Sequence, residues 1–330
     1  MMCTASNRPF KQVDVFTATP YQGNPLAVVL DGLGLDDEAM QAFARWTNLS
    51  ETTFLLPPTQ PGADYRVRIF TPGGELPFAG HPTLGSCHAW LEAGGQARQA
   101  DVIVQECAKG LVTIRRAGAA PGPGRLAFAA PAMTRSAPSP VTLGQIASAL
   151  GLKAPQILAA QLLDNGPVWL GLLLDSPDTV LQLQPDHLAL KHLGYAVVVA
   201  ALYEAASGTA PVLIGRANRE ARAVPQNAAQ ARLRNPSSGP SDASGAAESP
   251  DLEVRAFVDV IGIPEDPVTG SLNASLAQWL MADGTLSERY IASQGACLGR
   301  DGLVYLSRDA AGQVWVGGDV VTCIDGQVTL

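Results

Sequence analysis

The sequence of 330 residues is 47% hydrophobic and 16% charged, which predicts about two globular domains with sizeable cores. This composition excludes a disordered, collagenous or coiled-coil chain. Lysine and arginine number 22 against 30 for aspartate and glutamate, so the net charge is −8 at pH 7. An acidic chain argues against nucleic acid or an anionic membrane as the main partner.

The cysteines form an odd set of five with no Cys-x-x-Cys spacing, so we expect reduced thiols and no disulfide framework. The same spacing argues against a zinc site. Residues 1–10 lack the apolar stretch of a secretory signal, and the most apolar run, 196–202, is too short to span a bilayer. We therefore expect a cytoplasmic protein. The cysteines are Cys3, Cys87, Cys107, Cys297 and Cys323.

The first third of the chain is predicted to contain strands and one helix. Gly23-Asn24-Pro25 is expected to break the chain between the first two strands. Carboxylates at positions 36–38 suit a helix N-terminus, and apolar residues follow them at roughly helical spacing. The predicted strands are 13–16, 26–30, 52–56 and 65–70, and the apolar helix positions are Met40, Phe43, Ala44 and Trp46.

A long-range repeat is the most informative feature of the sequence. Segments 80–86 and 265–271 both contain Pro-x-x-Gly-Ser, and both run into a helical pattern that reaches Trp-Leu. Gly-Leu-Val recurs downstream of each copy, at 110–112 and 302–304. Three ordered matches favour duplicated domains over chance. The repeat predicts pseudo-symmetric helices over residues 82–93 and 267–281, whose N-termini face one cleft between the domains.

The second of these helices is expected to be buried on nearly all sides. Its large apolar residues are spaced i, i+4, i+7 and i+8, and alanine and serine occupy the remaining faces. We infer an α+β fold of two similar domains, residues 1–130 and 131–330, each with curved strands around one central helix. The final strand is expected to pack on the first domain. The alternative is an α/β sandwich with surface helices. The apolar residues are Leu272, Leu276, Trp279 and Leu280.

Residues 216–251 differ from everything around them. They are rich in proline, serine, glycine and asparagine and contain hardly any large apolar side chain. A stretch of this kind cannot bury enough surface to order itself, so we expect an exposed insertion in the second domain. Five arginines in its first half favour a solvated segment over a partner-binding arm.

Three residues are candidates for chemistry, and each has a simpler interpretation. His81 lies where a helix begins and backbone N–H groups are free, although a lone histidine is more often a packed residue. Asp266 holds the corresponding place in the second copy, either as a helix cap or facing His81 across the cleft. Glu51 is followed by Thr-Thr-Phe-Leu-Leu, so it is either an exposed turn residue or a partly desolvated acid with a raised pKa.

Other chemistries are poorly supported. The sequence has no Gly-x-Ser-x-Gly elbow, phosphate-binding loop, His-Glu-x-x-His motif or dinucleotide fingerprint. His187 and His192 are five apart, which does not place metal ligands on one helical face, so no metal is expected. A hydrolase that uses Ser86 or Ser271 is possible on paper, but each serine is expected in a first helical turn.

The chain resembles the phenazine-biosynthesis PhzF-like isomerase family. The resemblance is carried by Val-Asp-Val-Phe-Thr at 13–17, Gly-Asn-Pro-Leu-Ala-Val-Val at 23–29 and Asn-Leu-Ser-Glu-Thr-Thr-Phe at 48–54. It continues with Phe-Thr-Pro at 70–72, Glu-Leu-Pro-Phe-Ala-Gly-His-Pro-Thr-Leu-Gly at 75–85 and Glu-Asp-Pro-Val-Thr-Gly-Ser at 265–271. These motifs span nearly the whole chain except the insertion.

The resemblance implies a diaminopimelate epimerase-like fold with the active site between its two domains. It implies that Glu51 transfers a proton, with support from His81 and Asp266, and that no cofactor is needed. The residues implied to hold a small carboxylate-bearing substrate are Gly80, Pro82, Thr83, Gly270 and Ser271. Whether the chain forms a homodimer is left open.

Two alternatives remain at this point. A racemase or epimerase of this fold would use Glu51 with another base. The missing thiols speak against it, because the cysteine-dependent epimerases of this fold have a cysteine just before each helix-start glycine, where this chain has Ala79 and Thr269. A catalytically silent binding protein would have no chemical need for Glu51, His81 and Asp266 together. The family's commoner motif is Glu-Asp-Pro-Ala-Thr-Gly-Ser-Ala, and this chain replaces its two alanines with Val268 and Leu272. The segment before the motif, at 257–260, lacks the usual proline. These departures leave the choice of substrate open.

Overall fold

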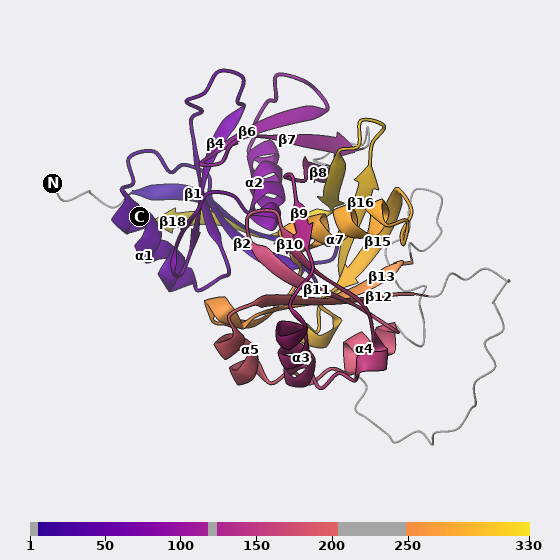
Figure 1. Cartoon of the computed structure of the whole chain (residues 1–330). Coiled ribbons are helices and arrows are strands. Elements are labelled where there is room, and N and C mark those ends of the chain that lie inside the picture. The colour runs from indigo at the N-terminus through magenta and orange to yellow at the C-terminus, as the bar shows by residue number, and fades with distance from the viewer. Residues whose placement is uncertain (1–5, 118–123, 204–248) are drawn as a thin grey trace.

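The computed structural model describes residues 6–117, 124–203 and 249–330 (Figure 1). The first part of the chain contains β1 (Asn7–Val15), β2 (Asn24–Val29), α1 (Asp37–Thr47), β3 (Thr52–Leu56), β4 (Tyr65–Thr71), β5 (Gly74–Leu76), α2 (Gly80–Glu92), β6 (Val102–Cys107), β7 (Gly110–Ala117) and β8 (Arg125–Ala129).

The rest of the chain repeats this sequence of strands with more helices on the outside. Its elements are β9 (Thr134–Ser136), α3 (Pro140–Ala149), β10 (Ile157–Asp164), β11 (Val168–Leu174), α4 (Pro177–Gln182), α5 (His187–Leu193), β12 (Ala196–Leu202), β13 (Leu252–Val258), β14 (Ile263–Asp266), α7 (Gly270–Ala282), β15 (Arg289–Gln294), β16 (Gly302–Arg308), β17 (Val314–Gly318) and β18 (Val320–Thr329).

Two central helices organise the packing. Helix α2 contacts β1, β2, β3, β6, β8 and β18, and helix α7 contacts β10, β16 and β17. Ten of the thirteen residues of each helix are buried, which confirms the expectation of a helix buried on nearly all sides. Small side chains on these helices allow strands to approach closely: a Cβ on Gly85 would lie 2.6 Å from the side chain of Leu26.

The strands around the two helices pair in the same order. Around α2, β1 runs antiparallel to β2, β2 parallel to β3, β3 antiparallel to β4, β4 parallel to β6, and β6, β7 and β8 are antiparallel. Around α7, β10, β11, β12, β13, β15, β16 and β17 repeat these directions one for one. This repetition is a structural duplication, and it confirms the predicted α+β fold class.

The two halves are joined through strands. β8 pairs with β17, and the C-terminal strand β18 returns to the first half to pair with β1 along its length. The side chain of Arg125 on β8 also contacts Asp319, which lies between β17 and β18, at 3.2 Å. Residue 130 falls between β8 and β9, and the domain boundary at that residue stays a prediction.

Shorter helices cover the outer faces of the sheets. Helices α3, α4 and α5 pack on β11 and β12 in a second apolar cluster, and α1 packs on β3 and β4 in a third. Met40, Phe43 and Ala44 are buried in α1 as expected. Trp46 lies in α1 as predicted, but it is 79% exposed and stacks on Phe43, because it points away from the buried face.

The structure corrects the register of the sequence repeat. Both helices begin at a glycine, Gly80 and Gly270, so Pro82 is the third residue of α2 while Pro267 precedes α7. Neither proline is the first helical residue, and Asp266 is the last residue of β14 and not a helix cap. The shared Pro-x-x-Gly-Ser letters therefore mark segments whose positions along the two helices differ by five residues. The helix-start positions that correspond are 79–80 and 269–270.

A second correction concerns Gly23-Asn24-Pro25: the break between β1 and β2 ends at Gly23, so only the glycine belongs to it. Asn24 and Pro25 are the first two residues of β2 and pair with Val15 and Asp14 of β1. Residues 216–248 of the expected insertion lie outside the described residues, and so does Cys3. The other four cysteines are unpaired. Among the described helices, none is long and apolar enough to cross a membrane.

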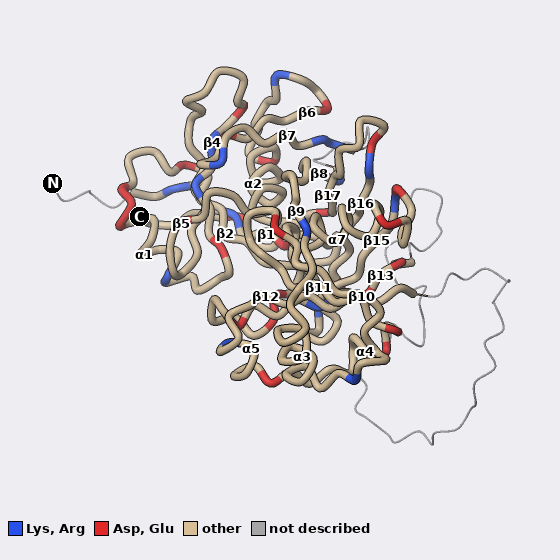
Figure 2. Tube along the Cα trace, viewed as in Figure 1, with Lys and Arg blue, Asp and Glu red and all other residues tan. Residues whose placement is uncertain are grey.

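Basic and acidic side chains are interspersed over the described chain (Figure 2). Many of them pair locally, as in the contacts of Arg68 with Glu75 and of Arg308 with Glu288. Such exposed pairs contribute little to stability. The charges that matter for the site are the buried ones described next.

Candidate active site

Glu51 stands between α1 and β3, and its side chain is largely withdrawn from water. Helix α1 is followed by its C-cap residue, Asn48, which has a left-handed backbone conformation. Residues 49–51 then lead to Thr52, the first residue of β3. The Glu51 side chain is 15% exposed, and its Oε2 atom has no hydrogen-bond partner among the described residues. Burial, with the nearby charge of Asp266, raises the pKa of Glu51 from 4.5 to about 8. The desolvated alternative for this residue therefore fits the geometry.

His81 faces Glu51 from the first turn of α2. Its Nε2 atom lies 3.4 Å from Oε2 of Glu51, and its ring is buried. Burial lowers the pKa of His81 from 6.5 to about 3, so the ring is neutral at physiological pH. On the other side of the ring, Nδ1 lies 3.4 Å from the amide nitrogen of Asn24. An amide nitrogen only donates, so this contact fits the tautomer with the ring proton on Nε2, toward Glu51, although the two amide protons are used at shorter distances by Asp266 and Val268.

Asp266 enters the site from the second half of the molecule. Its Oδ1 accepts a hydrogen bond from Asn24 at 3.1 Å, and its Oδ2 accepts one from the Thr269 hydroxyl at 2.5 Å. Burial raises the pKa of Asp266 from 3.8 to about 6, although these two hydrogen bonds act in the opposite direction. His81 and Asp266 thus lie on two sides of one residue, Asn24.

Asn24 links the first half of the molecule to the segment around Asp266, and the sequence pattern did not single it out. Its side chain is fully buried, and its amide donates to Asp266 and, at 2.9 Å, to the backbone carbonyl of Val268. The same amide faces His81. The only sequence signal was a polar residue beside Pro25 at the start of a strand. Nothing local to that position indicates partners more than 200 residues away.

A further polar network fixes the loop that carries Asp266. The side chain of Gln294 on β15 accepts from the Thr269 backbone N–H and donates to the Asp266 carbonyl, at 3.0 and 3.1 Å. Asn273 of α7 donates to the Gln294 side chain and to the Thr269 carbonyl, both at 2.9 Å. Because every one of these groups is buried, the network holds the backbone around Asp266 in one arrangement.

The N-termini of α2 and α7 meet at this place. A Cβ atom on Gly80 would lie 3.1 Å from the Cα of Gly270, and the converse distance is the same. Neither helix has a side-chain cap: Ala79 has no capping group, and the Thr269 hydroxyl is used by Asp266. Free backbone N–H groups and the positive ends of two helix dipoles therefore converge next to Glu51, His81 and Asp266. Such an arrangement favours an anionic ligand.

The remaining predicted substrate-binding residues lie in the first turns of the two helices. Pro82 is buried in α2 and has no backbone N–H to offer a ligand. The Thr83 hydroxyl is engaged within the protein, donating to Ala79 at 2.8 Å and accepting from Gln105 at 3.0 Å. Ser271 is the second residue of α7, and its carbonyl accepts from the buried Asn165. Gly80 and Gly270 are the first residues of their helices.

The other candidate chemistries do not fit the structure. Ser86 is in the second turn of α2 and not the first, and its hydroxyl is fully buried and donates to Thr53. His187 contacts Asp259 at 3.0 Å, away from the residues described above. Within the described ranges, no group of three or more metal-ligating side chains is present.

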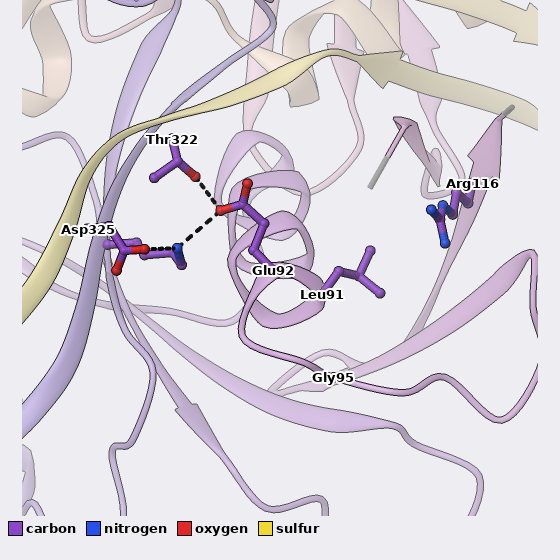
Figure 3. A pocket seen from close by; sticks show the side chains of 7 residues that line it. Leu91, Glu92, Gly95, Arg116, Thr322 and Asp325 are labelled. Carbon is purple, nitrogen blue, oxygen red and sulfur yellow. Dashed lines mark hydrogen bonds and ion pairs between the residues drawn. The ribbon is translucent and has the colours of Figure 1, made fainter. Parts of the chain in front are cut away.

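A polar hollow lies at the C-terminal end of α2, opposite the candidate site (Figure 3). It has a volume of about 630 Å³ and is lined by charged residues that pair among themselves. Lys11 contacts Glu92 at 3.2 Å and Asp325 at 2.7 Å. This hollow is separated from His81 by the length of the helix, so it is not part of the candidate site.

The arrangement around Glu51 is suited to moving a proton. An acid with a pKa near neutrality faces a neutral histidine donor, a second carboxylate lies beyond Asn24, and two helix N-termini supply positive potential. A group with a pKa near the working pH can both remove and return a proton. Positive potential stabilises negative charge that develops on a substrate.

Comparison with known proteins agrees with this description. The model of the family described as "Phenazine biosynthesis-like protein" matches residues 13–326. The chain is 32% identical to "Antisense-enhancing sequence 1" of Schizosaccharomyces pombe over 96% of its own length and 97% of that protein. It is 38% identical to the trans-2,3-dihydro-3-hydroxyanthranilate isomerase of Pseudomonas aeruginosa over 54% of this chain and 61% of that one. In the latter case less than two thirds of the relative is matched.

Solved structures show the same fold. The crystal structure of the Bacillus anthracis phenazine biosynthesis protein of the PhzF family aligns with a TM-score of 0.75 at 21% identity. The alignment covers 98% of this chain and 100% of that chain. At this identity the likeness shows the fold alone, and it confirms the fold that the resemblance implied.

Proposed function

Because the chain belongs to the phenazine biosynthesis-like protein family, we propose that it is an isomerase that moves a proton on a small carboxylate-bearing metabolite. Glu51 is the proposed acid and base, supported by His81 and Asp266. Proteins of this family are named isomerases in Pseudomonas aeruginosa and Mesorhizobium japonicum, among others. The proposal requires no cofactor, because side chains supply both the acid and the base.

One observation carries the proposal. Oε2 of Glu51 has no hydrogen-bond partner among the described residues, lies 3.4 Å from His81, and belongs to a carboxyl whose pKa is raised to about 8. A buried acid without a partner is costly to stability and is found mainly where function requires it. A merely structural glutamate at a turn would be expected to lie in water with its ordinary pKa.

The proposed reaction begins when the anionic form of Glu51 removes a proton from a carbon of the substrate. The electron pair left on that carbon forms a new double bond as a conjugated double bond of the substrate shifts, and the developing charge is shared with the substrate carboxylate, which lies against the two helix N-termini. Protonated Glu51 then delivers the proton to another carbon of the same molecule. The proton count is unchanged, and the enzyme ends as it began.

His81 and Asp266 have different parts in this proposal. Neutral His81, with its proton on Nε2 and no partner for it among the described residues, is the proposed donor to a substrate oxygen. Asp266 is held by Asn24 and Thr269 and raises the pKa of Glu51 by its charge. Its own pKa of about 6 leaves it mostly ionised at neutral pH. Because the pKa of Glu51 is higher than that of Asp266, we assign the proton transfer to Glu51 and the role of a fixed negative charge to Asp266.

Racemisation by paired thiols is the alternative that the geometry disfavours. Ala79 and Thr269 are the residues immediately before Gly80 and Gly270, where the helix N-termini meet. Neither is a cysteine, and Cys87 lies deeper in α2, where burial raises the pKa of its thiol to about 12. An epimerase in which Glu51 works with another base remains an outcome that the experiment can distinguish.

The proposal is tested by proton exchange in deuterated water, followed by NMR. The first probe is trans-2,3-dihydro-3-hydroxyanthranilate, the substrate named for a relative, and further small unsaturated carboxylates are screened beside it. We expect the wild-type protein to exchange or shift a carbon-bound proton of one of these probes and Glu51→Gln to do so at least about 100-fold more slowly. Inversion of one centre without a shift of a double bond would indicate an epimerase.

A matched control separates loss of chemistry from loss of structure. Glu38→Gln removes a carboxylate from the first turn of α1, in the same half of the molecule and away from the site. It should keep full exchange activity. Binding of a probe by both wild type and Glu51→Gln without any exchange would favour the silent binding protein over the isomerase.

A further inference from the structure

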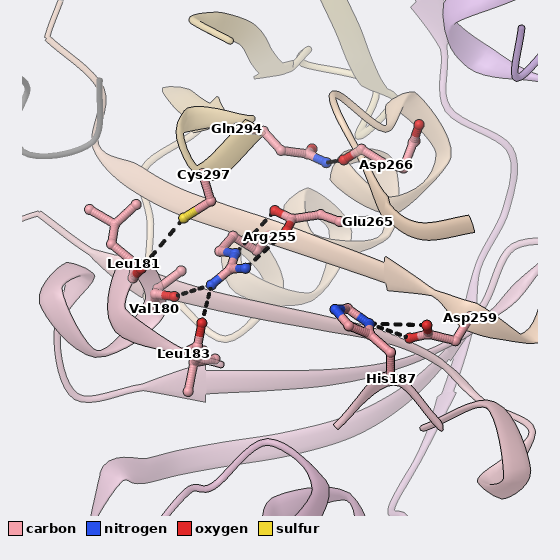
Figure 4. A network of polar contacts seen from close by, with 10 residues as sticks. All are labelled: Val180, Leu181, Leu183, His187, Arg255, Asp259, Glu265, Asp266, Gln294 and Cys297. Carbon is pink, nitrogen blue, oxygen red and sulfur yellow. Dashed lines mark hydrogen bonds and ion pairs between the residues drawn. The ribbon is translucent and has the colours of Figure 1, made fainter. Parts of the chain in front are cut away.

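A buried ion pair lies directly behind Asp266. The guanidinium of Arg255 on β13 donates from Nε and Nη2 to the two carboxylate oxygens of Glu265, at 3.0 and 2.9 Å (Figure 4). Both side chains are almost fully buried, at 6% and 7% exposure. The two bonds form the forked arrangement that gives an arginine–carboxylate pair its geometric specificity. Glu265 is the neighbour of Asp266 in the chain.

The same guanidinium also anchors a third element. Its Nη1 atom donates to the backbone carbonyls of Val180 and Leu183, at 3.1 and 3.0 Å, where α4 ends. A cation at a helix C-terminus is favourable, because free carbonyl groups gather there. Arg255 therefore ties β13, the end of α4 and Glu265 together. These contacts fix the position of the Glu265 side chain.

Strand β14 needs such a support, because its backbone pairing is sparse. It spans only Ile263–Asp266, and its register with β13 is shifted between the pairs Val258–Ile263 and Ala256–Asp266. Pro264 lies within it and has no N–H to donate. A strand paired at two positions is weakly held by its ladder, so side-chain contacts must fix where it ends. It ends at Asp266.

Alternation along the strand places the ion pair and the site on opposite faces. Successive side chains of a strand point to opposite sides of the sheet. Glu265 points to Arg255, whereas Asp266 points away from it (Figure 4). The carboxylate of Asp266 accepts hydrogen bonds from Asn24 and Thr269. Ala256, the partner of Asp266, belongs to the apolar cluster that contains α7, while Phe257 belongs to the cluster beneath α3, α4 and α5.

We propose that the Arg255–Glu265 ion pair is a positioning device that holds the carboxylate of Asp266 in the site. Arg255 and Glu265 touch no reacting group and act through the backbone of β14. This inference rests on the proposed role of Asp266, but it concerns where the carboxylate lies and not whether Glu51 transfers a proton.

The test removes the pair without leaving a buried charge. Losing only one partner would leave an uncompensated charge and risk unfolding, whereas replacing both by apolar side chains of similar size is often tolerated. The chosen variant is therefore Arg255→Met with Glu265→Met. The matched control is Arg68→Met with Glu75→Met, which removes another forked ion pair, in the first half and away from Asp266.

The readout is the pKa of Glu51, measured by carbon-detected NMR titration of its carboxyl group and assigned from its loss in Glu51→Gln. Asp266 and His81 are the titratable groups that face Glu51, and the charge of Asp266 raises its pKa. Asp266→Asn gives the size of that effect. If Asp266 moves out of place in the double variant, the pKa of Glu51 should fall by at least half as much as in Asp266→Asn.

The outcomes separate positioning from ordinary stabilisation. The proposal predicts a lowered pKa of Glu51 in the Arg255/Glu265 double variant and an unchanged pKa in the Arg68/Glu75 control, whatever happens to the melting temperature. An unchanged pKa in a folded Arg255/Glu265 double variant would overturn it. If that variant does not fold, Arg255→Lys, which keeps the charge but not the fork, should give a smaller fall of the same sign. No fall in a folded Arg255→Lys would then count against the proposal. The titration needs no substrate, so its failure leaves the proposed reaction standing.

Discussion

Gly80 and Gly270 face each other so closely that a methyl group on either would lie 3.1 Å from the Cα atom of the other. Each is the first residue of a central helix, so this contact sets the distance between the two helix N-termini. Because a side chain at either position would separate them, glycine is required here by close approach and not by backbone conformation.

Gly80→Ala should destabilise the protein and disable the site. Its Cβ would lie 2.8 Å from the buried ring of Phe128 as well as against Gly270, so a well-packed region would have to move. Overpacking of this kind costs about 1–3 kcal/mol. Urea unfolding measures the loss of stability. The control is Gly144→Ala in α3, where a Cβ meets nothing within 4 Å and alanine should stabilise by about 0.5–1 kcal/mol. Equal effects of the two substitutions would contradict the role of the glycine contact.

Glu51→Gln should stabilise the protein at alkaline pH and have no effect at acid pH. Burial raises the pKa of Glu51 from 4.5 to about 8, so ionisation of this group costs the folded state stability as pH rises between those values. Glutamine does not ionise, so the variant should gain roughly 2–4 kcal/mol at pH 8 relative to wild type. The difference should vanish near pH 4. His81, whose pKa is lowered to about 3, affects both proteins alike below pH 6.5.

Urea unfolding of wild type and Glu51→Gln at pH 4, 6 and 8 measures this difference. A constant difference at all three values would mean that Glu51 titrates as an ordinary exposed carboxyl, against the burial described here.

Asp266→Asn should move the pH dependence of proton exchange to lower pH. The charge of Asp266 adds to the effect of burial in raising the pKa of Glu51, so its removal should let Glu51 ionise earlier. A pH profile of exchange for both proteins provides the comparison, and a rate that rises with pH at the same position in both would be inconsistent with this coupling.

Asn24→Ala should weaken both the fold and the site. The substitution leaves Asp266 and the Val268 carbonyl without their donor, which costs about 1–3 kcal/mol for buried groups. It also frees the His81 ring to take either tautomer, so proton exchange should slow. Gln278→Ala is the control, because it too removes a side-chain amide that donates to a backbone carbonyl, that of Pro131, away from the helix N-termini. The control should lower the melting temperature but leave the NMR titration of Glu51 unchanged.

The sequence predicts most of what is local in this structure. Burial on all sides of α7 follows from Leu272, Leu276 and Trp279 at helical spacing among small residues, and the structure confirms it. The acid at position 51 was correctly placed between a helix and a strand. Whether it was exposed or buried could not be decided locally, because the residues that cover it come from α2 and from the second half of the molecule.

The register of the duplication was the main error, and its cause is physical. Residues 79–81 and 269–271 share only a glycine. The close contact between Gly80 and Gly270 requires that both positions lack a side chain, but it sets no requirement on the neighbouring residues. The stronger match of letters, Pro-x-x-Gly-Ser, lies five residues out of register. The directions of the strands around α2 and α7 show the correct correspondence. Which strand pairs with which cannot be deduced from local patterns in a single sequence.

Asn24 could not have been found from its neighbours. Its amide connects His81, Asp266 and the Val268 carbonyl, which come from α2, the end of β14 and the turn before α7. Arg255 and Glu265 are similar, since an arginine in a strand is ordinarily an exposed residue. Tertiary packing decides that these side chains are buried, and their hydrogen-bonding groups then pair mainly with residues distant in the chain.

The measurement that tests the central claim most directly is the rate at which Glu51→Gln and Glu51→Asp exchange a carbon-bound proton of the substrate with deuterated water. Glutamine preserves the shape of the side chain but cannot carry the proton, so exchange should fall at least about 100-fold while binding of the carboxylate ligand is retained. Aspartate keeps the acid at a shorter reach and should retain more activity than glutamine. A Glu51→Gln protein that exchanges the proton within a few-fold of the wild-type rate would contradict the assignment of Glu51 as the acid and base.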